Sequence, residues 1–161
     1  MCAAPGGKST SLLQELPENS LLVCNEIVRS RAYILAENIA KWGNPNAIVT
    51  NNKPEDFSKA TDFFDVIVVD APCSGEGMFR KDPGAIDEWS IENVTLCAQR
   101  QKDIIGHIWE SLKPGGILVY STCTYNREEN EENIQWICYN FAAEKPDVHL
   151  PAHSGILTSD A

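Results

Sequence analysis

The chain lacks long apolar runs and has little positive charge. No apolar run approaches the ~20 residues that a membrane-spanning helix needs, so we expect no membrane association. The chain has 13 Lys and Arg residues against 23 Asp and Glu residues. The resulting net charge of −10 argues against a surface that binds nucleic acid without other parts of the protein. Residues Met1 to Lys8 are small and Gly-rich, unlike a secretory signal. We therefore expect a cytoplasmic protein.

Paired cysteine motifs are also absent. The six cysteines form no C-x-x-C pair and no pattern with histidine, so we expect neither a zinc site nor a disulfide framework. Cys24, Cys97 and Cys138 lie within apolar patterns typical of buried thiols. Cys73 and Cys123 differ, because each directly follows an apolar run, where a sheet of the α/β kind binds its ligands. Two thiols so placed suggest covalent chemistry.

Short apolar runs alternate with helical patterns along the chain. The runs are continuous rather than alternating, as expected of parallel strands covered on both faces, and they occupy residues 21–24, 47–50, 66–69 and 117–120. Helices are predicted over residues 9–15, 28–42, 91–112 and 127–143, with stops at Gly43 and at Pro114–Gly116 and an N-cap at Asn126. The pattern predicts a single α/β domain with a Rossmann-like, doubly wound, mostly parallel sheet over residues 1–161.

Both ends of the chain lack strands that such a sheet normally has. A Gly-rich turn usually follows the first strand, yet Met1 opens directly on one. At the other end, the polar stretch 151–161 follows only one weak strand candidate, residues 147–150. We therefore expect a fragment of a longer protein, without its first strand and its C-terminal strands.

The Gly-rich turn admits two interpretations. Cys2–Ser9 imitates the phosphate-binding G-x-x-x-x-G-K-[ST] loop, but Cys2 stands where its first glycine is required, so an NTPase is the weaker alternative. The turn is better explained as the approach of backbone to a nucleoside cofactor at a helix N-terminus, with Lys8 at the floor of the site. Glu26, about 20 residues further on, has the spacing of a carboxylate that accepts the ribose hydroxyls.

Three motifs in order resemble those of one enzyme family. Cys2–Lys8, Asp70–Gly75 and Ser121–Thr124 are similar to the signature motifs of the NOL1/NOP2/Sun family of RNA cytosine-C5 methyltransferases, and Gly75–Lys81 resembles the bacterial branch that acts on small-subunit ribosomal RNA. The resemblance implies S-adenosylmethionine as methyl donor and RNA as substrate, ribosomal RNA before transfer RNA. The resemblance does not indicate an oligomeric state.

The resemblance also implies which residues hold the cofactor. They are Cys2, Ala3, Ala4, Pro5, Gly6, Gly7 and Lys8 in the loop, Glu26 at the ribose and Asp70 near the reacting centre. The family often has an acidic residue near the end of the third strand, where this chain has Asn51, Asn52 and Lys53. Asn52 is the candidate for reading the adenine edge, although turn chemistry explains asparagine there equally well.

The chemistry of cytosine explains why two thiols and an acid are wanted. C5 is a poor nucleophile until a group adds to C6, which a thiolate does well. The resemblance assigns this attack to Cys123, and Cys73 would assist the later release. Asp70 could hold the N3 and N4 edge and, if protonated, supply a proton.

Further residues are assigned by their place along the chain. Lys8, Pro72, Phe79, Arg80 and Lys81 are candidates for RNA contact, with a mobile surface loop as the alternative for residues 79–81. Glu128, Glu129, Glu131 and Glu132 are expected to form a solvated first helical turn rather than a metal site. A non-catalytic fragment that only resembles the enzyme remains the alternative function.

Overall fold

The structure, a computed structural model, describes residues 1–146. They fall into two compact units: Met1–Pro72 with Asp103–Ser121, and Cys73–Lys102 with residues 122–146. Each unit is described by itself. The strand candidate at residues 147–150 lies outside the described residues, and a single domain over residues 1–161 remains a prediction.

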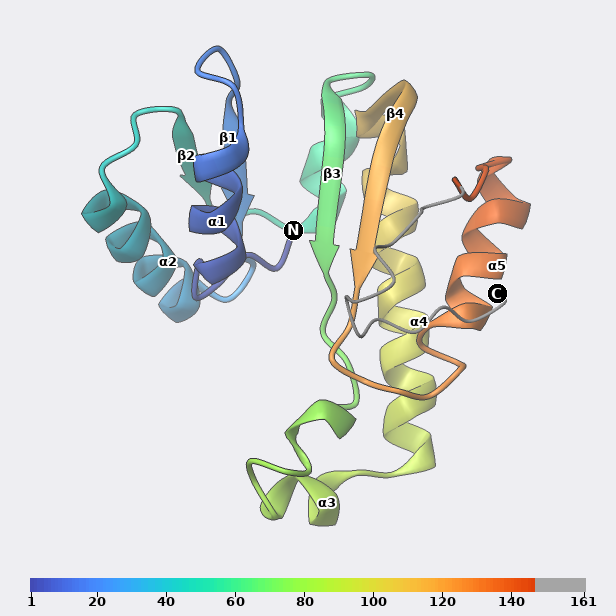
Figure 1. Ribbon diagram of the computed structural model, residues 1–161. Helices are drawn as coiled ribbons and strands as arrows, with labels where there is room; N and C mark the ends of the chain where they lie inside the picture. Colours follow the sequence, from blue (N-terminus) through green and yellow to red (C-terminus); the bar gives the residue numbers. More distant parts are fainter. Residues whose placement is uncertain (147–161) are drawn as a thin grey trace, which may run out of the picture. The chain divides into compact units, whose positions relative to one another are not determined.

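The first half of the first unit packs two helices against a pair of strands (Figure 1). Its elements are α1 (Gly7–Glu15), β1 (Leu22–Asn25), α2 (Arg29–Trp42) and β2 (Ala47–Thr50). The two strands are parallel, and α2 ends at Gly43, whose φ of 77° is the left-handed conformation expected of a C-terminal glycine. Leu13, Leu35 and Ile39 pack with Cys24 in a shared apolar core, which confirms Cys24 as a buried thiol.

The second half of this unit pairs two longer strands. β3 (Phe64–Asp70) follows the short helix η1 (Pro54–Lys59), and β4 (Leu112–Ser121) follows α4 (Ile91–Ile108) and the short helix η3 (Trp109–Ser111). β3 and β4 run parallel and lie side by side in Figure 1, with Asp70 opposite Ser121. The end of α4 packs on β3 through buried isoleucines. The carboxyl ends of both strands therefore meet at one edge.

The parallel α/β class is confirmed, but the strands form two pairs instead of one continuous sheet. Residues Met1 to Ala3 bond to the ends of both pairs. The Met1 amino group donates to the Val68 carbonyl at 2.7 Å, and the Asp70 N–H donates to the Met1 carbonyl at 3.3 Å. The Ala3 N–H donates to the Asn25 carbonyl at 3.0 Å. These bonds bring the Gly-rich turn to the carboxyl ends of β1 and β3.

The second unit is mostly helical. It contains η2 (Glu76–Met78), α3 (Gly84–Glu88), the start of α4, and α5 (Glu131–Phe141). Sequence patterns predicted a helix from residue 127 with Asn126 as N-cap, but α5 begins only at Glu131. Asn126 still exchanges bonds with Glu129, because its Oδ1 accepts the Glu129 N–H at 2.9 Å and its Nδ2 donates to the carboxylate at 2.8 Å. The capping exchange thus stabilises the turn before α5.

A second predicted helix boundary is also wrong. The expected helix over residues 91–112 ends at Ile108 and is followed by η3, and Pro114–Gly116 lies inside β4 instead of stopping the helix. Residues 117–120 form a strand because they pair with residues 66–69 of β3. A register irregularity between Phe64 and Val66 accommodates the proline and the glycines. Tertiary pairing here overrides the local turn signal.

Candidate active site

The Gly-rich turn leads directly into α1, and one of its glycines is required by space. Gly6 has a φ of 112°, and a Cβ added there would lie 3.1 Å from Cδ1 of Leu35 in the core. A side chain at this position would be strained both by the backbone angle and by the close neighbour. The first N–H groups of α1 have no partner within the helix, so the turn presents donors to a ligand.

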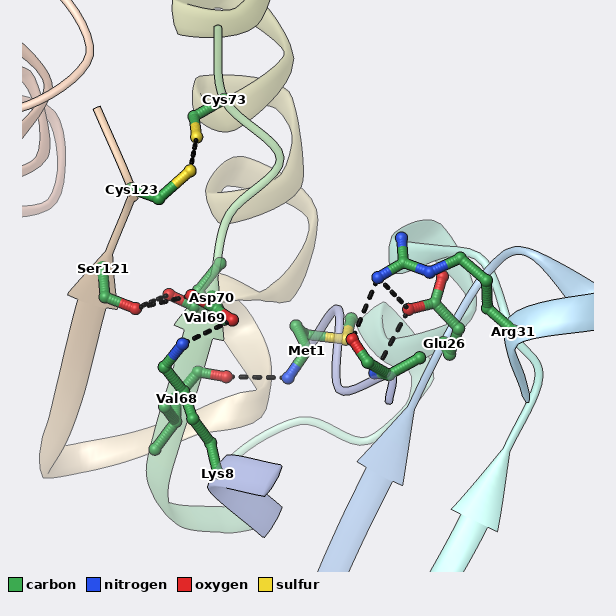
Figure 2. A network of polar contacts seen from close by, with 11 residues as sticks. Met1, Lys8, Glu26, Arg31, Val68, Val69, Asp70, Cys73, Ser121 and Cys123 are labelled. Carbon is green, nitrogen blue, oxygen red and sulfur yellow. Dashed lines mark hydrogen bonds and ion pairs between the residues drawn. The ribbon is translucent and has the colours of Figure 1, made fainter. Parts of the chain in front are cut away.

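Glu26 ties this turn to the end of β1. The residue is 1% exposed, and its Oε2 accepts the Ala4 N–H at 3.3 Å while Oε1 accepts the Val28 N–H at 3.1 Å. Arg31 lies 3.8 Å from the same carboxylate and donates to the Ala4 carbonyl at 2.9 Å (Figure 2). Glu26 is therefore a buried carboxylate held by backbone donors, and not an exposed acid at the start of a helix. The sequence patterns did not predict the contact with Arg31, because an arginine at this position gives no indication of its partner.

Asp70, at the end of β3, is held from two sides. The Lys8 Nζ lies 2.7 Å from Oδ2, and the Ser121 hydroxyl donates to Oδ1 at 3.1 Å (Figure 2). Lys8 is largely exposed, with its side chain 62% accessible. Ser121 is a second contact that sequence analysis did not single out, although the predicted pairing of the two strands could have indicated it.

A cavity of about 920 Å³ lies in this first unit. It is lined by the turn from Met1 to Ser9, by Asp70 and by the facing sides of β1 and β3. This volume falls within the range of small-molecule sites, and its walls are mostly apolar, as such sites usually are.

The remaining predicted contacts lie on loops. Asn52 is exposed; its amide donates to Asp56 at 3.4 Å, and its backbone pairs with Asn25. Phe79 packs edge-on against Trp89 at 6.5 Å between ring centroids, while Arg80 and Lys81 are exposed. Pro72 is the last residue of the first unit and is half-buried.

The two predicted catalytic thiols lie together in the second unit. The sulfur atoms of Cys73 and Cys123 are 2.9 Å apart, although 50 residues separate them along the chain (Figure 2). Both are free thiols, and Cys123 is exposed. Burial, and then the hydrogen bond with Cys123, raise the pKa of Cys73 to about 12. Cys73 therefore keeps its proton at neutral pH.

Buried polar groups surround the thiol loops. Glu129 is 0% exposed, so the expectation that it is solvated is wrong, and Glu76 is 9% exposed. Burial acts to raise the pKa of Glu76, but hydrogen bonds from Thr124, Tyr125 and Asn126 outweigh it, and the pKa is lowered. The Asn126-x-x-Glu129 spacing was the available signal for Glu129, whereas nothing in the sequence marked Glu76.

In the described part of the chain, each helix is too short or too polar to span a membrane. Within residues 1–146, no three His, Cys, Asp or Glu side chains are grouped so that they could hold a metal ion.

The fold and the Gly-rich turn define a class of protein. Parallel strands alternating with helices, a turn of small residues opening α1 and a carboxylate after β1 are typical of Rossmann-like folds that bind a nucleoside cofactor. Comparison with known proteins is more specific, because residues 1–154 match the family described as 16S rRNA methyltransferase RsmB/F. The chain belongs to this family, which confirms the resemblance read from its motifs.

Individual relatives cover most of this chain. It is 42% identical over 142 residues to Ribosomal RNA small subunit methyltransferase F of Pectobacterium atrosepticum, which is 88% of this chain and 29% of that protein. The structure of NSun6 from Pyrococcus horikoshii with SFG has a TM-score of 0.74 at 30% identity, covering 86% of this chain and 35% of that one. A methyltransferase homolog from the same organism has a TM-score of 0.72 at 33% identity, over 86% and 43%. The chain thus spans about 29% of the length of its curated relative.

Proposed function

We propose that this chain carries the catalytic core of an enzyme that transfers a methyl group from S-adenosylmethionine to C5 of a cytosine in small-subunit ribosomal RNA. Membership of the 16S rRNA methyltransferase RsmB/F family supports the reaction class and the RNA. The observation that carries the chemistry is the pair of thiols, Cys73 and Cys123, with sulfurs 2.9 Å apart. A pair of adjacent free thiols suits a reaction in which a sulfur adds to a base and must later leave it.

The residues of the first unit fit the cofactor. S-adenosylmethionine, when bound, supplies a methyl group on a positively charged sulfur. The N–H groups at the start of α1 suit its polar groups, and each carboxylate oxygen of Glu26 has capacity for a further donor such as a ribose hydroxyl. The turn Cys2–Lys8 borders the cavity, and Asn52 is the candidate for the adenine edge.

Cys123 is the proposed nucleophile. Its thiolate adds to C6 of cytosine, and the electron pair of the C5–C6 bond moves to C5, which then takes the methyl group. A water molecule takes the C5 proton, the electron pair of that C–H bond re-forms the C5–C6 double bond, and the C6–sulfur bond breaks to release Cys123 as a thiolate. Cys73 keeps its proton because its pKa is raised to about 12, so its S–H can donate a hydrogen bond to the departing thiolate of Cys123. This division assigns attack to Cys123 and assisted release to Cys73.

Asp70 is proposed to bind the edge of the base. One oxygen accepts from Ser121, which orients the carboxyl group, and the other pairs with Lys8. Lys8 is exposed and flexible, so it can leave this oxygen when the cytosine amino group or the cofactor approaches.

Contact with RNA is proposed for Lys8, Pro72, Phe79, Arg80 and Lys81. The exposed Arg80 and Lys81 can meet phosphates, and Phe79 can stack on a base only with the face that Trp89 leaves open. These few contacts sit in a chain of net charge −10, so most of the RNA affinity has to come from elsewhere.

Substitution of each thiol tests the mechanism. With the full chain and an unmodified small-subunit RNA, Cys123→Ala abolishes methyl transfer because no adduct forms. Cys73→Ala accumulates a covalent RNA–protein adduct, visible as a shifted band on a denaturing gel. Cys138→Ala, a half-buried thiol in α5, is the matched control and behaves as the unsubstituted chain.

Three outcomes contradict the proposal. Normal turnover by Cys123→Ala rules out its role as nucleophile. Binding of labelled S-adenosylmethionine without methyl transfer by the unsubstituted chain favours the non-catalytic alternative, and binding of ATP instead favours the NTPase. Bisulfite mapping of ribosomal and transfer RNA, with and without the gene, identifies the cytosine.

A further inference from the structure

Two buried carboxylates of the second unit have no part in the proposed chemistry. Glu129 is 0% exposed and Glu76 is 9% exposed. A buried carboxylate is costly unless hydrogen-bond donors surround it, and such a group fixes the position of whatever donates to it. Both carboxylates accept hydrogen bonds from the loops that carry Cys73 and Cys123, and Glu129 also accepts one from α4.

Glu129 connects three segments. The N–H of Ser74, the residue after Cys73, lies 3.1 Å and 3.3 Å from its two oxygens. The amide of Gln101 in α4 donates to Oε2 at 2.6 Å, and the amide of Asn126 donates to Oε1 at 2.8 Å. Gln101 is itself oriented, because its oxygen accepts from the amide of Asn133 at 2.7 Å.

Glu76 and Gly77 make the reverse connection, from the segment that follows Cys73 to the loop that carries Cys123. Glu76 follows Cys73 by three residues, and its Oε2 accepts the N–H groups of Tyr125 at 2.7 Å and of Asn126 at 2.9 Å, just after Cys123. The Gly77 N–H also donates to the Cys123 carbonyl at 2.7 Å. Each thiol loop thus donates hydrogen bonds to a carboxylate that belongs to the segment of the other thiol.

We infer that Glu129 is a positioning residue that holds the Cys73 loop against the Cys123 loop and so sets the separation of the two sulfurs. Its contact with Ser74 is one residue from Cys73, and its contact with Asn126 is three residues from Cys123. The consequence for catalysis rests on the function proposed above, whereas the effect on the separation of the sulfurs does not.

The chemistry of the donors makes this role specific to a carboxylate. Ser74, Gln101 and Asn126 all present N–H groups, and a carboxylate accepts at both oxygens. Glu129→Gln has nearly the same shape but places an NH₂ group against at least one of these donors. The Ser74 loop or the Asn126 loop then has to move.

A bifunctional thiol reagent of short span, dibromobimane, measures the separation directly, because its fluorescence rises when one molecule joins two adjacent thiols. In the full chain, we expect Glu129→Gln to slow the joining of Cys73 to Cys123 by about 10-fold or more, as a displacement near 1 Å does to reactions that depend on orientation. Glu132→Gln is the control: the same change of charge at an exposed side chain three residues further along, in α5, leaves the rate unchanged. Peptide mapping identifies the joined pair.

Methyl transfer to RNA provides the second measurement. We expect Glu129→Gln to lower kcat by about 100-fold with little change in the KM for RNA, because the thiols and not the RNA contacts are displaced. Joining of the thiols at the unsubstituted rate in Glu129→Gln overturns the inference. Slowed joining in a protein whose unsubstituted form transfers no methyl group leaves the inference standing and refutes the proposed function instead.

A folding control keeps the test decisive. Thermal unfolding shows whether Glu129→Gln folds, and if it does not, Glu129→Asp replaces it. Aspartate keeps the charge but is one methylene shorter, so it withdraws from Ser74 and should likewise slow the joining reaction. An unsubstituted rate in a folded Glu129→Asp counts against the inference.

Discussion

The pKa of the Cys73 thiol differs from that of an ordinary cysteine for two reasons. Burial and the hydrogen bond with Cys123 raise its pKa to about 12, so very little thiolate forms below pH 9. We expect Cys73 to be alkylated slowly by iodoacetamide at pH 8 and its rate to climb steeply toward pH 11. Mass spectrometry of the Cys73 peptide across this range measures the profile.

Removal of Cys123 changes this profile in a defined direction. Cys123→Ala takes away a contact that raises the pKa of Cys73, so the midpoint of the profile moves to lower pH and alkylation at pH 8 becomes faster. Cys138→Ala, whose thiol is in α5, should leave the profile where it was. A midpoint that is the same with and without Cys123 contradicts the proposed contact between the thiols.

At the scale of elements, η2 approaches the Cys123 loop so closely that only glycine fits. A Cβ added at Gly77 would overlap the carbonyl group of Cys123, whose oxygen accepts the Gly77 N–H. We expect Gly77→Ala to lower the free energy of unfolding by about 1–3 kcal/mol, the usual cost of overpacking. Urea denaturation of the full chain measures this value.

Gly106 in α4 provides the matched control. It is exposed, and a Cβ there would meet no atom within 4 Å. Gly106→Ala should therefore raise the free energy of unfolding by about 0.5–1 kcal/mol, since alanine favours a helix interior. Equal losses at both glycines would show that the close approach of η2 to Cys123 is not what constrains Gly77.

At the scale of the whole chain, stability is expected to fall at alkaline pH. Burial raises the pKa of Cys2, Cys24, Cys73 and Cys97 above that of an exposed thiol. Below about pH 8.5 the folded and unfolded chains both carry neutral thiols, and the contribution to stability is complete. As the pH rises toward the folded pKa values, the unfolded chain releases protons first and stability is lost.

Urea midpoints between pH 7 and 10, measured with a reductant present, check this expectation. Cys24→Val removes one titrating thiol from the core, so the midpoint should fall less steeply above pH 8.5 than in the unsubstituted chain. A midpoint that does not change over this interval would be inconsistent with buried, protonated thiols.

The local patterns predicted most elements but not all of their surroundings. Continuous apolar runs identified the four strands, and Gly43 marked the end of α2, because both signals depend on neighbours in the chain. The predicted end of α4 was wrong, because pairing with β3 includes Pro114–Gly116 in β4 instead of leaving them as a helix stop. Glu129 was expected to be solvated, because its donors Ser74 and Gln101 come from distant parts of the sequence.

The sequence by itself determined the class of this protein, its family and the identities of the candidate groups. The order of residues is enough to define motifs such as Cys2–Lys8, because the chemistry of a motif depends on its residue types and their spacing along the chain. Only the tertiary structure decided that the sulfurs of Cys73 and Cys123 lie 2.9 Å apart and that Glu129 is buried among donors. The physical reason is that such contacts join segments tens of residues apart, and they form only when packing pays the entropy of closing those loops.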